Sequence, residues 1–195
     1  MGAQADDEQQ RRHLKDSPIL RTSLTYGVIA GLIVAIPMFT LLAMDSDHTS
    51  WSSSQFFGYA MMILALSMIF IGVKSYRDNV KGGVIKFGQA FLLGLGISVV
   101  AALIYVIGWE ITLYLTDYSF ASDYAAAALA AAEAKGTPPA ELETMRAQYA
   151  QFQELYTNPL FRMPMTFIEI FPVGLIISLI AAALLRNPRF FPARA

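Results

Sequence analysis

The stretch "MTFIEIFPVGLIISLIAAALL", residues 165–185, is apolar almost throughout, yet it contains Glu169 and, three residues later, Pro172. A helix needs about 20 mostly apolar residues to cross the hydrocarbon core of a bilayer, and this stretch has that length. Three more apolar runs occupy roughly residues 19–44, 56–73 and 87–115, and we place the fourth run at 164–185. Together these four runs predict a membrane protein.

The composition points the same way. Hydrophobic residues make up 55% of the 195-residue chain and charged residues only 15%, which departs from the average soluble domain. The apolar runs do not alternate, and a bilayer core leaves no water for unpaired backbone groups, so each run is predicted to be a helix. There is no cysteine, which excludes disulfides and thiolate chemistry.

Lysine and arginine are unevenly distributed along the chain. Eleven of the fourteen lie in the tail before the first run or at its start (Arg21), in the loop between the second and third, or after the fourth. The other two connections hold only three, together with eight acids. By the positive-inside tendency, both termini and the loop between the second and third runs are expected to face the cytoplasm, and the other two connections are expected to face outward. We therefore expect a cytoplasmic tail at 1–18, a transmembrane domain at 19–186 and a second cytoplasmic tail at 187–195.

The outward connection at 116–160 is predicted to form an extracytoplasmic helical hairpin. Residues 122–135 are rich in alanine, the strongest helix former, and Gly136 can end that helix in a left-handed conformation. A second helix is expected to begin with Thr137 as its cap and Pro138 at its first position. Its apolar stripe is Leu142, Met145, Tyr149, Phe152 and Tyr156. The facing side of the first helix is expected to be Phe120, Tyr124, Ala127 and Ala131. The stripe either closes the hairpin or binds a partner.

Small residues recur every four positions in three of the four predicted spans. Such rows let membrane helices approach closely. The predicted packing positions are Gly27, Gly31, Gly94, Ser98, Gly174 and Ser178, with Ala35, Ala102 and Ala182 continuing the rows. These contacts could form within one chain or in a homo-oligomer. Pro37 and Pro172 each remove a backbone donor, so we expect both to bend their helices.

Two acids, Glu110 and Glu169, lie within apolar runs and form the candidate polar or ion site. Acids at such depth usually face a bundle interior or a wet cavity. In the structural interpretation, Glu169 bonds a polar partner such as Thr166, Tyr105 or Tyr59, or a backbone group freed by Pro172. In the functional interpretation, Glu110 and Glu169 approach each other and take up a proton or a cation.

Nothing in the sequence predicts catalysis. His13 and His48 are expected on opposite sides of the membrane, so they cannot form one metal or acid–base site, and we expect no metal and no cofactor. The acidic outward connection disfavours nucleic acid as a partner. The cytoplasmic loop "KSYRDNVKGG" is interpreted as solvated anchoring to lipid head groups, with an ordered Arg77–Asp78 pair as the alternative.

Four motifs carry a family resemblance: "GVKSYRD", "GG" followed by "FGQAF", "NPLF", and "TFIEIFPVGLIISLIAA". Together they resemble the bacterial membrane family catalogued as domain of unknown function 4199, over about residues 26–185. The resemblance implies four spans and an outward helical insertion, and it implies no activity.

The sequence thus predicts an all-α integral membrane protein with four transmembrane helices and an extracytoplasmic helical hairpin between the third and fourth. The first functional hypothesis is a non-enzymatic structural or interaction component of the inner membrane, which contacts lipid and an envelope or membrane protein through residues 116–160. The alternative is a subunit of a small oligomeric proton- or cation-coupled transporter that uses Glu169, with or without Glu110.

Overall fold

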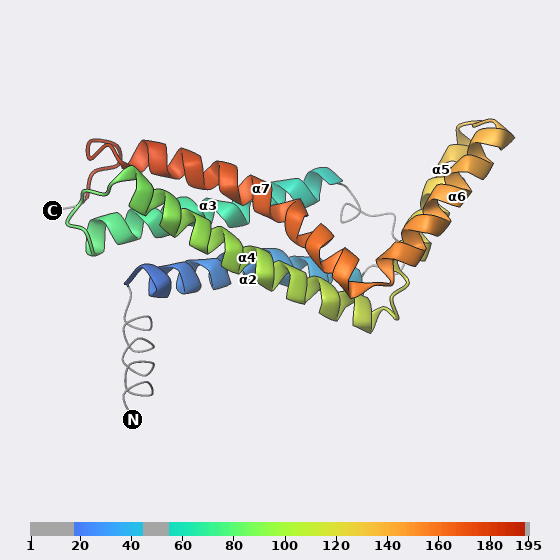
Figure 1. Ribbon diagram of the computed structural model, residues 1–195, viewed down its shortest axis with the longest axis horizontal. Coiled ribbons are helices and arrows are strands. Elements are labelled where there is room, and N and C mark those ends of the chain that lie inside the picture. The colour runs from blue at the N-terminus through green and yellow to red at the C-terminus, as the bar shows by residue number, and fades with distance from the viewer. Residues whose placement is uncertain (1–17, 45–54, 194–195) are drawn as a thin grey trace, which may run out of the picture. The chain divides into compact units, whose positions relative to one another are not determined.

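The computed structural model describes residues 18–44 and 55–193, except for the side chains of 38–44 and 55–58. Over these residues the chain forms helices and no strand (Figure 1). In chain order they are α2 (Pro18–Met44), α3 (Gln55–Asn79), α4 (Phe87–Leu115), α5 (Phe120–Ala134), α6 (Pro139–Tyr156) and α7 (Pro159–Leu185). The all-α fold class expected from the sequence is therefore confirmed.

Within the described residues, four helices are long and apolar enough to cross a membrane. The candidate spans are Pro18–Pro37 in α2, Tyr59–Asn79 in α3, all of α4 and all of α7. Many of their large apolar side chains are exposed, as expected where lipid is the solvent.

Two spans extend beyond their predicted ends. α3 continues six residues past Val73, and its polar last turns are supported by an ion pair between Lys74 and Asp78, four residues apart. α7 begins at Pro159 instead of Pro164. There the Asn158 side chain accepts a hydrogen bond from the backbone N–H of Leu160 at 2.9 Å, and a proline fits the first helical position.

The chain divides into two compact units. The first, which we call the bundle unit, comprises residues up to Tyr105 and from Ile168 onward. The second, the α5–α6 unit, comprises Val106–Phe167. It holds the end of α4, the whole of α5 and α6, and the start of α7.

Small residues lie at the helix contacts of the bundle unit. A Cβ added to Gly174 would lie 2.8 Å from the side chain of Ser98, and one added to Gly94 would lie 3.0 Å from Ser178. The two serines are fully buried, and their hydroxyl oxygens lie 3.1 Å apart within hydrogen-bond distance. α4 and α7 therefore approach as closely as their backbones permit, within one chain.

The predicted small-residue row of α2 also faces α4. A Cβ on Gly27 would lie 2.5 Å from Val100, and one on Gly31 would lie 2.6 Å from Ile104. Pro37 lies inside the continuous helix α2, and Pro172 lies inside α7. The bends expected at these prolines stay a prediction.

In the α5–α6 unit, residues early in α5 contact residues late in α6. The rings of Tyr124 and Tyr149 lie 6.1 Å apart, and further along α5 the carboxylate of Glu133 lies 2.9 Å from Arg146. This order of contacts is the one made by two helices that run in opposite directions. All five residues of the predicted α6 stripe are buried or half-buried.

Two details of the predicted helix pair were wrong. Gly136 does adopt a positive φ of 76°, but Pro138 caps α6 and the helix begins at Pro139, one residue later than expected. The buried side of α5 is also turned relative to the predicted face. Ala121 and Ala125 are buried, whereas Ala127 and Ala131 are exposed.

Candidate functional site

Arg162 and Glu110 form an ion pair inside two candidate spans. Arg162 lies in the first turn of α7, and Glu110 lies in the last turns of α4. The guanidinium Nε donates to Oε1 of Glu110 at 2.8 Å, and Nη2 donates to Oε2 at 2.6 Å. The side chains are 7% and 17% exposed. This two-point geometry matches the planar fork of arginine, which lysine cannot reproduce.

The remaining contacts of Arg162 tie this pair to the neighbouring turns. Its Nη1 donates to the backbone oxygen of Thr157 at 2.9 Å and, less closely, to that of Tyr156 at 3.3 Å. The Tyr118 ring lies 5.0 Å from the guanidinium carbon, close enough for a cation–π contact. Arg162 therefore joins the ends of α4, α6 and α7 while its charge is neutralised by Glu110.

An aromatic cluster adjoins the ion pair. The indole N–H of Trp109 donates to the hydroxyl of Tyr156 at 2.7 Å, and the ring of Phe120 packs edge-on against Trp109. Leu113 and Ala121 are buried beside them. These contacts hold the start of α5 against the end of α4.

A cavity of about 460 Å³ opens next to this cluster, within the α5–α6 unit. It is lined by Leu113, Tyr118, Ala121, Ser122, Gln153, Tyr156, Thr157 and Arg162. The lining is mixed, with apolar walls and several hydroxyl and amide groups. Because Glu110 neutralises Arg162, the cavity suits an uncharged group better than an anion.

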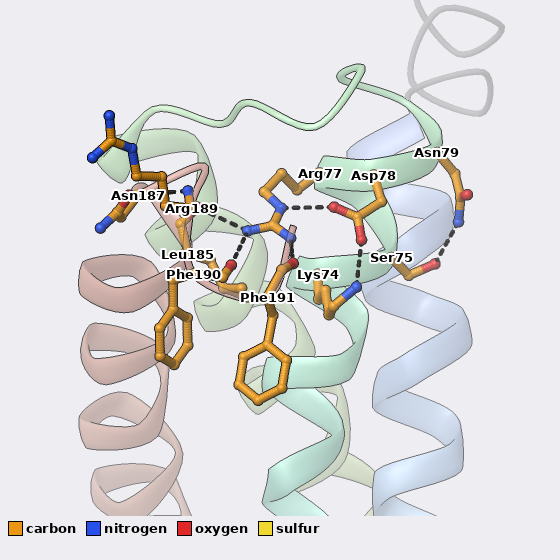
Figure 2. Close-up of polar contacts among 10 residues, drawn as sticks. All are labelled: Lys74, Ser75, Arg77, Asp78, Asn79, Leu185, Asn187, Arg189, Phe190 and Phe191. Carbon is orange, nitrogen blue, oxygen red and sulfur yellow. Dashed lines mark hydrogen bonds and ion pairs between the residues drawn. The ribbon is translucent and has the colours of Figure 1, made fainter. Parts of the chain in front are cut away.

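A second polar cluster surrounds Arg77 in the bundle unit (Figure 2). The Arg77 side chain is completely buried, and its Nε donates to Asp78 at 2.7 Å. Its Nη1 donates to the backbone oxygen of Phe190 at 2.9 Å and, more weakly, to that of Leu185 at 3.5 Å, and its Nη2 donates to the oxygen of Phe191. Asp78 also accepts from Lys74.

Only part of this loop differs from its main sequence interpretation as a solvated segment: the side chain of Arg77 is buried and that of Asp78 is 14% exposed. The alternative, an ordered Arg77–Asp78 pair, is the arrangement found. Sequence reasoning missed the burial of Arg77 because its carbonyl partners lie 108 to 114 residues away. The only local signal was an arginine followed by an aspartate at the end of an apolar run.

The two predicted intramembrane acids have different surroundings. Glu110 is paired with Arg162 inside the α5–α6 unit. Glu169 belongs to the bundle unit, near the middle of α7, and its side chain is exposed. Within residues 18–44 and 55–193, Glu169 forms no ion pair.

No cluster of three or more histidine, cysteine, aspartate or glutamate side chains occurs in the part of the chain that the structure describes. His13 and His48 lie outside the described residues. Every buried side-chain nitrogen or oxygen that the structure describes has a hydrogen-bond partner.

Four apolar spans and helices throughout the described residues define a multi-pass helical membrane protein. Comparison with known families shows that residues 25–187 match the family DUF4199, which is described as a protein of unknown function. The chain belongs to this family, as the resemblance in its sequence motifs indicated. No curated protein and no solved structure matches the chain.

Proposed function

We propose that this chain is a non-enzymatic structural or interaction component of a bacterial inner membrane, with both termini in the cytoplasm. The α5–α6 unit is the part that meets another envelope or membrane component. The uneven distribution of lysine and arginine between the connections supports this orientation.

One observation carries this proposal: the α5–α6 unit has a cavity of about 460 Å³ and exposed apolar side chains on the same elements. Tyr118 is 50% exposed, Tyr124 49% and Leu155 45%. Tyrosines are enriched in the buried cores of protein interfaces, where they bring a large apolar area and a polar tip. A partner side chain of moderate size and no charge would fit the cavity.

Glu110 supports the non-enzymatic interpretation. Both of its carboxylate oxygens accept hydrogen bonds from Arg162, so the acid stabilises the junction of α4 and α7. A group held in this way is poorly placed to exchange a proton in each cycle of a reaction.

Photo-crosslinking in intact membranes tests the proposal. A photoreactive amino acid is placed at Tyr118 or Leu155, and as a control at Met145, which is half-buried in the α6 stripe. We expect one adduct of defined mass from both exposed positions and none from Met145. Equal adducts at all three positions, or adducts with lipid alone, would contradict a protein partner at this surface.

The exposed Glu169 favours a second candidate, an oligomeric proton- or cation-coupled transporter subunit. An exposed carboxylate in a span costs a few kcal/mol against lipid, so it is typically found facing protein or water. In an oligomer, neighbouring copies would enclose it. Four spans are few for a monomeric transporter, so a strictly monomeric mass in detergent counts against this candidate.

Proteoliposomes that contain a pH-sensitive dye separate the two candidates. If Glu169 carries a transported proton, Glu169→Gln abolishes uptake while Glu154→Gln, at an exposed position of α6, leaves it unchanged. Identical traces for the wild type and Glu169→Gln would end the transport hypothesis.

A further inference from the structure

Two segments of the bundle unit carry an excess of positive charge. They are the loop after α3, residues 80–86, and the C-terminal segment, residues 186–193. They contain four cations and no acid. The cations are Lys81, Lys86, Arg186 and Arg189, and all four side chains are exposed. None of them forms an ion pair with any residue in 18–44 or 55–193.

The acid that is nearest in sequence to the loop is already neutralised. Asp78 accepts hydrogen bonds from both Lys74 and Arg77. Arg77 in turn has no exposed surface. No acid among residues 18–44 and 55–193 therefore neutralises the four exposed cations, and their charge can attract an anionic ligand.

Arg77 holds the two segments together. Its guanidinium binds the backbone oxygens of Phe190 and Phe191. The Phe70 ring packs edge-on against both phenylalanine rings, at 6.2 and 6.1 Å. A Cβ on Gly83 of the loop would lie 3.6 Å from the Cβ of Ala193. The C-terminal segment is thus fixed beside the loop, so little conformational entropy is lost on binding.

Exposed apolar side chains lie among these cations. Phe191 and Val84 are each 59% exposed, and Val80 is 48% exposed. The Arg189 side chain points away from the Arg77 guanidinium (Figure 2). Cations interleaved with apolar groups at the end of a span match the boundary between lipid head groups and acyl chains.

We propose that residues 80–86 and 186–193 form a binding surface for the phosphate head groups of anionic lipids, and that Arg77 positions it. The positive charges of lysine and arginine neutralise the negative charge of the lipid phosphodiester. Phe191 and Val84 contact the acyl chains. Free phosphate lacks the acyl chains and binds this surface weakly.

Native mass spectrometry of the purified full chain in detergent tests this surface. The probes are phosphatidylglycerol and phosphatidylcholine. Each cation near an anionic lipid contributes about 1 kcal/mol, or about fivefold in affinity. We expect phosphatidylglycerol to be retained over phosphatidylcholine, and R186Q/R189Q to lower that preference by about 30-fold at low salt.

The matched control is K135Q/R146Q, which removes two cations from the α5–α6 unit and leaves the preference unchanged. Arg77→Gln lowers the preference as well, although its own side chain does not reach lipid. Equal behaviour of R186Q/R189Q and K135Q/R146Q would overturn the proposal. Displacement of phosphatidylglycerol by inorganic phosphate at matched concentration would also overturn it. Because Arg186 and Arg189 are exposed, their variant is expected to fold.

Discussion

Arg162 and Glu110 are joined by two parallel hydrogen bonds, 2.8 Å and 2.6 Å long, between the first turn of α7 and the last turns of α4. A lone acid or a lone arginine at this position would face a large desolvation cost. As a pair, the two side chains have no net charge, and they hold the last turns of α4 against the first turn of α7. Glu110, one of the two acids in the candidate ion site predicted from the sequence, is engaged in a contact between α4 and α7.

Arg162→Met is expected to destabilise the protein strongly. It leaves Glu110 largely buried without its partner, and removal of one member of a buried pair costs about 3 kcal/mol or more. Thermal unfolding in detergent measures this loss. Arg162→Lys recovers only part of it, because lysine cannot bind both carboxylate oxygens.

The double variant R162M/E110Q supplies the control for that measurement. Because it removes both charges, its unfolding temperature is expected to lie above that of R162M alone. Additive losses from the two single variants would contradict a direct coupling between these side chains.

Arg77→Gln is expected to release the C-terminal segment. Arg77 donates to the backbone of Phe190 and Phe191, and hydrogen bonds from charged groups contribute about 1.5–3 kcal/mol each. Trypsin cleavage of the Arg189–Phe190 bond should therefore be at least about tenfold faster in Arg77→Gln. Lys74→Gln, which leaves the Arg77 contacts to these carbonyls in place, is the matched control. Unchanged cleavage in Arg77→Gln would show that the aromatic contacts alone hold the segment.

The lengths of the apolar runs predicted the spans well, because hydrophobic length is read directly from sequence. Hydropathy could not predict that α3 continues to Asn79, since its last turns are polar and depend on the Lys74–Asp78 pair. The partners of Arg162 and Arg77 were even harder to predict from the sequence. Glu110 lies 52 residues before Arg162, and only the fold brings the two together.

Gly174→Ala is expected to cost about 1–3 kcal/mol, because the added methyl group meets Ser98 at 2.8 Å in a fully buried contact. Gly88→Ala is the matched control within α4, since nothing lies within 4 Å of its added Cβ. That control should be neutral or gain up to about 1 kcal/mol of helix propensity.

The double variant G174A/S98G makes room for the added methyl group and should recover much of the stability lost in G174A. Unfolding midpoints in detergent compare all of these variants. If G174A and G88A are equally stable, α4 and α7 do not approach each other as closely at this point as the structure describes.

Single cysteines test the orientation of the spans, since the chain has no native cysteine. Val84→Cys lies in the loop between α3 and α4, and Ala130→Cys lies in α5, and both positions are exposed. The excess of lysine and arginine around the first position predicts that it faces the cytoplasm. An impermeant maleimide applied to intact cells should then label Ala130→Cys and leave Val84→Cys unmodified until the membrane is opened. Because α4 alone separates these positions, labelling of both from one side would mean that α4 does not cross the bilayer. Labelling of Val84→Cys alone would invert the orientation and place the basic surface that Arg77 holds together on the outside of the cell.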